Sequence, residues 1–582
     1  MNMSILIFTL PLGAIFLSLL LNRVVPTRVL AIVSAAIFAA TSVLVFVGYS
    51  HDALAWSVYQ WMALDNQVIQ LSFNLSGANW ALALVVTGGG ALALLGLAVA
   101  FPPAVRGFGG LLASLLMVLW ISMLGLAVEH TFVLSIVWGL LTLFCFLTMR
   151  SSGSQSETQT LPLTFMAGLI STIVLLGTAL AMQAGGVGAV PGPFILIAWL
   201  TIALLMFGAP PFHAIVNEQA EMPSGIAGIV LAFGLPLFGG MVLTRFITTQ
   251  AILTPAWTSI LAIIGIVTLL VGAAGALSEI RIRRLVGWQL TAQMGLVIIV
   301  LGQLEAVSSV VAPALLANTT LTTIVSYLAV TLVERYAGTD DISKIDKPQL
   351  LMLPGISFLI AAASSVGVPG TLGFWPRIML FAELYRAWPW VLPLVLVGST
   401  LMALAYLAPL TIFIHRNAVY AAPSDDSLDW SALVARLCPA LTAIPLIVLG
   451  VVPQLGGAEW NTAIEQAGGG IQVFTGFSVQ IVSAGIAMLL ITTPLILRWR
   501  SVRSGTIDPD MRSTILTPQA LAESLQILVW IGSPVGLYSR LWEGALWLSQ
   551  RTRWALSLFE QRYYLAGFMI SLVTVLLLLL QG

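Results

Sequence analysis

The sequence predicts an all-α polytopic membrane protein that crosses the bilayer about sixteen times. Of its 582 residues, 59% are hydrophobic and 8% are charged, and the mean hydropathy is +1.02. A soluble domain carries roughly 25% charged residues, so a soluble fold is excluded. Two apolar stretches are interrupted by Gly and Pro, which predicts two broken membrane helices.

Windows of about 20 apolar residues, the length that a helix needs to cross a bilayer, place the spans. They lie near 3–22, 28–48, 79–101, 108–127, 131–149, 161–183, 193–213, 223–246, 256–278, 285–302, 310–333, 350–376, 388–414, 432–453, 474–498 and 561–581. Between the second and third spans, segment 49–78 alternates apolar and polar residues, which predicts a short β-hairpin.

The basic residues predict the topology. With the N-terminus outside, both lysines (Lys344 and Lys347) and most arginines fall on the cytoplasmic side, as the positive-inside rule requires. The outer loops 49–78, 184–192, 303–309 and 454–473 contain no Lys or Arg. The exceptions are Arg245, Arg377 and Arg386. The pattern favours a multi-pass protein of the bacterial cell membrane with both termini outside.

The first predicted break contains Gly208, Pro210 and Pro211 and is followed by His213. The second contains Gly367, Pro369 and Gly370 and is followed by Arg377. Paired broken helices are typical of an ion or substrate path, because unwound backbone is tolerated in a membrane only where it faces protein or water. The alternative is a proline kink that only shapes packing.

The sequence predicts no catalytic residue, metal site or cofactor in this chain. Cys145 and Cys438 lie in apolar helices without metal-ligand spacing, and the four histidines are scattered. No phosphate-binding or dinucleotide motif is present, and the net charge of zero does not favour nucleic-acid binding.

Segment 499–560 differs from the rest of the chain. A helix start at Thr517-Pro518 is followed by Leu and Trp residues interspersed with Arg, which predicts a short amphipathic helix on the cytoplasmic face before a final span. Such a face needs burial against the lipid bilayer or other membrane subunits.

Four ordered stretches resemble the antiporter-like membrane subunits of respiratory complex I, which are related to Mrp antiporter and membrane hydrogenase subunits. They are Pro211-Phe212-His213 with Glu218, Glu221 and Met222-Pro223-Ser224; Arg281-Ile282-Arg283-Arg284-Leu285 with Gln293-Met294-Gly295; Gly338-Thr339-Asp340-Asp341-Ile342; and Gly367-Val368-Pro369 through Gly373-Phe374-Trp375-Pro376-Arg377. The resemblance covers roughly residues 75–415. The span count and the amphipathic tail are similar to the L-type subunit.

The resemblance implies two inverted five-helix repeats, 108–246 and 256–414, each with one broken helix. On this scheme, 1–107 forms three spans with the hairpin, 432–498 forms two extra spans, 499–560 is the amphipathic segment and 561–582 is the final span.

In the family, buried Glu, Lys and His residues form a chain of ionisable groups across the two repeats. Here the corresponding positions are mostly not ionisable, namely Gly139, Met206, Ala232, Asn318 and Thr322, and only Arg377 remains as a cation. An arginine side chain has a pKa above about 12 and does not release a proton in practice. The departures therefore predict a degenerate or altered proton path.

The candidate ion-path residues are Arg377, His213, Glu218, Glu221, Glu383, Asn318 and Thr322. Each has a structural alternative. Asn318 and Thr322 can join helices by hydrogen bonds, and His213 can serve as a polar group in the break. Glu218 and Glu221 are expected at solvated helix ends, and Glu383 is either an exit group or an interface anchor.

The leading hypothesis is a membrane-arm subunit of a complex-I-like NADH:quinone oxidoreductase, without a redox centre of its own and acting partly as scaffold. Its partners would be other membrane-arm subunits and the lipid bilayer. The alternatives are a subunit of another energy-coupled complex (an Mrp-type antiporter, a hydrogenase or an inorganic-carbon uptake complex) and a stand-alone secondary transporter.

Overall fold

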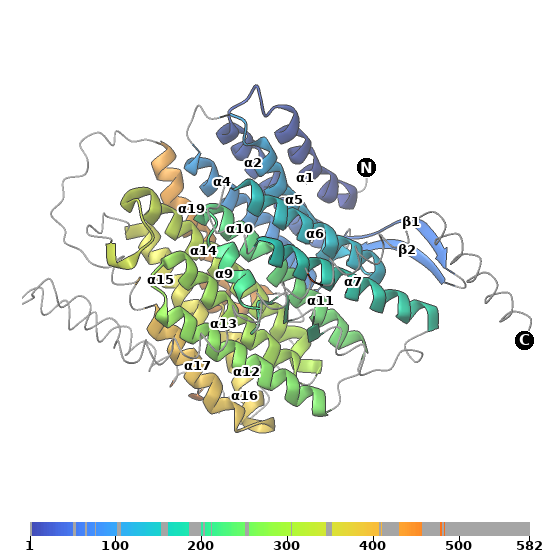
Figure 1. Cartoon of the computed structure of the whole chain (residues 1–582), viewed down its shortest axis with the longest axis vertical. Helices are drawn as coiled ribbons and strands as arrows, with labels where there is room; N and C mark the ends of the chain where they lie inside the picture. The colour runs from blue at the N-terminus through green and yellow to red at the C-terminus, as the bar shows by residue number, and fades with distance from the viewer. Residues whose placement is uncertain are drawn as a thin grey trace, which may run out of the picture. The chain divides into compact units, whose positions relative to one another are not determined.

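The computed structural model is helical over most of the part of the chain that it describes (Figure 1). It describes residues 3–50, 54–64, 67–75, 77–101, 106–152, 161–185, 200–201, 204–205, 207–210, 212–250, 255–303, 305–344, 352–406, 409, 430–456, 478–479, 482 and 547. Nine helices in these ranges are long and apolar enough to cross a membrane, and four shorter apolar helices accompany them. The predicted spans 474–498 and 561–581 and the amphipathic segment 499–560 fall almost wholly outside the described residues.

The chain begins with two packed helices and a hairpin. They are α1 (Met3–Leu20), α2 (Thr27–Ser50), β1 (Ala55–Leu64) and β2 (Gln67–Asn74). The strands pair antiparallel with Ala55 opposite Asn74, which confirms the predicted hairpin. The third span has a π-helical turn in its middle and comprises α3 (Ala78–Leu84), η1 (Val85–Gly89) and α4 (Gly90–Ala100).

The hairpin is joined to the start of the fifth span. The Asn74 side-chain amide donates to Oε1 of Glu129 at 3.2 Å. The next residue, His130, caps that helix, because its Nδ1 accepts from the Phe132 amide at 3.2 Å. Burial lowers the pKa of His130 below its ordinary value, which favours the neutral ring that this cap requires.

Six helices follow in the described part of the first half of the chain. They are α5 (Gly109–Ala127), α6 (Thr131–Ser151), α7 (Leu161–Gly185), α9 (Ala214–Ala220), α10 (Ser224–Phe233) and α11 (Leu235–Gln250). The single span predicted at 223–246 is thus interrupted at Gly234. Pro236 lacks an amide hydrogen and disfavours a continuous helix there. The Ser122 hydroxyl of α5 donates to the Phe233 carbonyl at this point.

The second half contains α12 (Pro255–Ser278), α13 (Ile282–Leu301), α14 (Glu305–Ala337), η2 (Ile342–Lys344), α15 (Met352–Val366), α16 (Phe374–Ala387), α17 (Val391–Ala405), α19 (Trp430–Val451) and η3 (Pro453–Gly456). Helix α14 packs against α10, α11, α13, α15, α16 and α19. It therefore joins elements from both halves of the chain. The broken twelfth span continues through α16 to residue 387, further than the predicted limit of 376.

Helices α12 and α13 approach each other closely through glycines. A Cβ atom at Gly272 would lie 2.5 Å from the Ala292 backbone nitrogen, and one at Gly295 would lie 2.5 Å from the Leu269 backbone nitrogen. Small residues allow backbones to meet inside a membrane, where packing replaces the hydrophobic effect as the force between helices.

We expect Gly295→Val to lower the stability of the folded chain by about 1–3 kcal/mol, because the added atoms overlap backbone that cannot move aside. The matched control is Gly177→Val on α7, where nothing lies within 4 Å of the added Cβ. Thermal unfolding in mild detergent measures both. Equal midpoints for the two variants would show that the α12–α13 contact does not need the glycine.

Candidate functional site

The first break lies between the apolar seventh span and the short helix α9. Gly208 has φ +59°, a left-handed conformation that glycine adopts without strain. A Cβ there would lie 2.4 Å from Cγ2 of Val216. Pro210 lies two residues further on and is half-buried, whereas Pro211 and Met206 are outside the described residues.

His213 directly precedes α9 and is buried against α13. Its side chain is 1% exposed, and its ring stacks on Trp288 with a centroid distance of 5.1 Å. Three polar atoms on and beside α9 are buried without a hydrogen-bond partner among the described residues: His213 Nδ1, Asn217 Oδ1 and Gln219 Nε2. Buried polar groups need partners, so this part of the structure is suited to ordered water.

Glu218 lies on α9 and is 8% exposed. The expectation that Glu218 is solvated was wrong. Helix α9 packs along α13, and the Glu218 side chain is buried there. Glu221, at the end of α9, is only partly buried and pairs with arginines from the start of α13.

A charged cluster lies where α9 and α10 meet α13, and we call it the Arg283 cluster. Its members are Arg281, Arg283, Arg284, Glu221, Glu334 and Asp340. Nε of Arg283 lies 3.0 Å from Oε1 of Glu334 and 3.0 Å from Oδ2 of Asp340. Arg281 and Arg284 reach the two oxygens of Glu221 at 3.0 and 3.3 Å.

The cluster also binds backbone. The Arg283 guanidinium donates to the carbonyl oxygens of Glu221 and Met222 at 3.3 and 3.1 Å. The Tyr327 hydroxyl of α14 in turn donates to the Arg283 carbonyl at 3.0 Å. The α9–α10 junction of the first half is therefore tied to α13 and α14 of the second half.

The second break separates α15 from α16. Gly367 and Gly370 have φ +86° and +85°, with Pro369 between them. Helix α19 supports this loop, since the Leu372 amide donates to the Leu446 carbonyl at 2.7 Å and the Trp375 indole donates to the Gly450 carbonyl at 2.8 Å.

A buried neutral network, which we call the Asn318 network, joins this break to α13 and α14. The Ser364 hydroxyl donates to Oδ1 of Asn318 at 2.6 Å, and the Gly373 amide donates to the Ser364 hydroxyl at 3.1 Å. Gln293 of α13 donates to the Thr322 hydroxyl at 3.4 Å and accepts from Thr319 at 3.2 Å. The structure thus brings the predicted residues Asn318 and Thr322 together.

Gln293 and Ser364 belong to this network but are not among the predicted ion-path residues. Gln293 lies in one of the stretches that resemble the family. Its position in an apolar helix was a usable signal, because a glutamine inside a span needs a partner. Ser364 gave a weaker signal, since serine is common among small residues that precede a break.

Arg377 lies one turn into α16 and is completely buried. It donates to the Ser399 hydroxyl at 3.3 Å and to the Ser365 carbonyl, and its Nε has no hydrogen-bond partner among the described residues. None of the ion pairs found in the described ranges includes it. The Arg377 guanidinium is therefore stabilised by the neutral oxygens of Ser365 and Ser399.

Glu383 is 9% exposed on the same helix. Six positions along a helix correspond to about 240° of rotation and ~9 Å of rise, so Glu383 does not face the site of Arg377. The Asn318 network and the Arg283 cluster are also separate, because Asn318 and Glu334 lie about 24 Å apart along α14.

Gly139, one of the positions where the resemblance implies an ionisable residue, lies in a close contact between two helices. A Cβ at Gly139 would lie 2.9 Å from Cγ2 of Thr172, and the neighbouring Trp138 indole donates to the Ser171 hydroxyl at 2.9 Å. Helices α6 and α7 close on each other here, where a buried carboxylate would need room and a partner.

Comparison with known proteins finds similarity for the central part of the chain. Residues 130–403 match the family described as NADH:quinone oxidoreductase/Mrp antiporter, transmembrane region. NADH-quinone oxidoreductase subunit N of Chromohalobacter salexigens is 26% identical over 290 residues, which cover 48% of this chain and 59% of the relative. The probable A/B subunit of a K(+)/H(+) antiporter of Rhizobium meliloti is 23% identical over 381 residues, which cover 61% of this chain and 36% of the relative.

Solved structures share the fold. The Mrp complex of a Dietzia species contains a chain that matches with TM-score 0.71 and 20% identity over 91% of this chain and 59% of its own length. The archaeal membrane-bound sulfane sulfur reductase contains one with TM-score 0.63 and 17% identity, which covers 84% of this chain and 100% of its own length. The predicted resemblance to antiporter-like membrane subunits is confirmed. The chain spans about six-tenths or less of the first relatives' length.

We expect Arg283→Gln to destabilise the folded chain by about 1–3 kcal/mol, because Glu334 and Asp340 would then face each other without a cation. The value is below the ~3–5 kcal/mol of a fully buried pair, since the Arg283 and Glu334 side chains are 19% and 24% exposed. The control is Lys344→Gln, whose side chain is 73% exposed in its pair with Asp341 and which should unfold like wild type. A loss of stability that is no larger for Arg283→Gln than for the control, in thermal unfolding, would contradict the prediction.

Proposed function

We propose that the chain, whose residues 130–403 carry the transmembrane region shared by NADH:quinone oxidoreductase and Mrp antiporter subunits, is an antiporter-like subunit in the membrane arm of a complex-I-like NADH:quinone oxidoreductase. On this proposal it carries no redox centre, lies among other membrane-arm subunits, and contributes to a proton-translocating assembly mainly as scaffold.

The main support for the proposed scaffold role is the environment of Arg377. Proton transfer through a membrane helix needs buried groups that change protonation and partners that shift them. Arg377 retains its proton, and the Asn318 network beside the break consists of amides and hydroxyls, which do not titrate in the physiological range. On this proposal the broken helix is preserved, while the described residues that contact Arg377 and Asn318 offer no group that loads and releases a proton near pH 7.

The first break supports a limited role in hydration. The three unpartnered polar atoms beside and on α9, with Glu218 and Glu221 nearby, suit a water-filled pocket at the end of the span. From the arginine pattern we propose that the α9 end of this span lies on the cytoplasmic side of a bacterial cell membrane and that Glu383 lies toward the other side.

The resemblance to antiporter-like subunits also leads us to propose that 108–246 and 256–414 are two inverted repeats.

A second candidate is a subunit of an Mrp-type antiporter. The Rhizobium relative covers more of this chain than the Chromohalobacter relative does. The buried residues do not separate the two candidates, because the partners decide which complex is formed.

The first experiment is purification of the tagged full chain in mild detergent, with mass spectrometry of the copurifying proteins and an NADH:quinone reductase assay. We expect flavin and iron–sulfur subunits together with NADH-dependent activity. Antiporter subunits without reductase activity would favour the second candidate. A monodisperse chain without partners would contradict both and favour a stand-alone transporter.

The second experiment tests Arg377 in the purified complex reconstituted into vesicles. We expect Arg377→Gln to leave the number of protons moved per electron unchanged, because a group that keeps its proton does not shuttle one. Arg386→Gln, on an exposed position of the same helix, is the matched control. A lower proton-to-electron ratio in Arg377→Gln alone, at equal quinone reduction, would show that this chain has a working proton path.

A further inference from the structure

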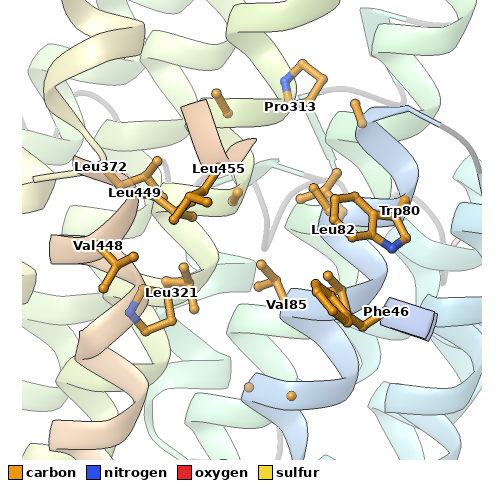
Figure 2. Close-up of a pocket in the computed structure, with 18 of the residues that line it drawn as sticks. Phe46, Trp80, Leu82, Val85, Pro313, Leu321, Leu372, Val448, Leu449 and Leu455 are labelled. Carbon is orange, nitrogen blue, oxygen red and sulfur yellow. The ribbon is translucent and has the colours of Figure 1, made fainter. Parts of the chain in front are cut away.

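A cavity of about 520 Å³ lies between α2, the α3–η1 region, α14 and α19. Figure 2 shows that side chains from these separate helices line it, with Phe46, Trp80 and Val85 on one side and Val448, Leu449 and Leu455 on the other. Its volume is within the range of roughly 300–1,000 Å³ that is typical of ligand sites.

The lining offers almost nothing to a polar ligand. It contains no Asp, Glu, Lys, Arg or His among the described residues. The Trp80 indole already donates to the Val45 carbonyl at 3.1 Å, and the Thr442 hydroxyl donates to the Cys438 carbonyl at 2.7 Å. An ion or a charged headgroup would lose its water here without replacement, so the occupant must be apolar.

One side of the cavity is open at the surface of the described helices, and an apolar opening of this kind in a membrane-spanning region is suited to lipid. Its rim is exposed and apolar, with Phe46 62%, Leu455 59% and Val448 39% exposed. Its floor is closed, since Leu82 and Leu321 are 1% and 3% exposed.

One end of the cavity has an aromatic pair of the kind that is typical of a membrane interface. The Tyr49 ring, at the end of α2, stacks on Trp80, near the start of α3, with a centroid distance of 4.1 Å. Trp and Tyr gather where hydrocarbon meets headgroups. Along α14 the lining runs from Val310 to Leu321, about 16 Å, which is half of the ~30 Å hydrocarbon core. The cavity is therefore as deep as one leaflet.

We propose that this cavity holds one acyl chain of a phospholipid from that leaflet. The headgroup stays at the Tyr49–Trp80 end, and the chain runs inward to Leu321 and Leu372. Leu372 belongs to the loop of the second break, and Leu321 is next to Thr322 of the Asn318 network. The bound lipid thus packs directly against the wall of the broken helix.

The test uses membrane vesicles that contain the full chain and a phosphatidylethanolamine with a photoreactive group in its acyl chain. After illumination, labelled peptides are mapped by mass spectrometry. We expect labelling of α3, α14 and α19 at cavity residues, and an at least fivefold loss of this labelling in Ala317→Phe, which fills the floor. Val448→Trp fills the cavity from its exposed rim and gives the same loss without a change in the core. The control is Ala40→Phe, on an exposed position of α2, which should keep full labelling.

Two results would overturn the proposal. Labelling of cavity residues that is equal in wild type and both filled variants would show that no chain enters. Displacement of the label by a quinone with a long isoprenoid tail, but not by unlabelled phospholipid, would show that the occupant is a quinone tail.

Discussion

The second half of the structure depends on one constraint, which is that a helix broken inside a membrane must find partners within the protein for its freed backbone groups. At the second break the partners come from several helices. The Ser364 hydroxyl accepts from the Gly373 amide, the Leu446 carbonyl of α19 accepts from Leu372, and Arg377 covers the Ser365 carbonyl. Water does not reach the hydrocarbon core, so these contacts hold the unwound segment in place. Arg377 donates hydrogen bonds to the Ser365 carbonyl and the Ser399 hydroxyl, and among the described residues no carboxylate pairs with it.

The same constraint explains why a neutral network can occupy a site where the resemblance to antiporter-like subunits implies ionisable groups. Asn318 and Gln293 satisfy the break by hydrogen bonds that do not change with protonation. The lipid-facing cavity lies along a different face of α14 from this network, so one helix supports the break from the interior and borders the apolar cavity. On the proposed scaffold role, the fold keeps its shape without ionisable groups at this break, because amides and hydroxyls supply the hydrogen bonds.

Much of the fold could be predicted from the sequence, because composition, span length and the Gly–Pro breaks act locally. The hairpin at 55–74 and the glycines of the second break belong to this class. The burial of Glu218 could not be predicted, since it depends on α13, which lies far away in the sequence. The pairing of Gln293 with Thr322 and of Asn318 with Ser364 also arises only when three helices meet. The interruption at Gly234 had a local signal in Pro236, but the Ser122 hydroxyl that meets the Phe233 carbonyl comes from another span.

The Arg283 cluster has a mechanical consequence. Because one guanidinium holds two carboxylates and two carbonyls, the α9–α10 junction cannot shift against α14 unless several of these contacts break together. The two halves of the described bundle are thereby stiffened at this end. On the proposed scaffold role, this stiffness would let the chain transmit a displacement between neighbouring membrane subunits without loading a proton itself.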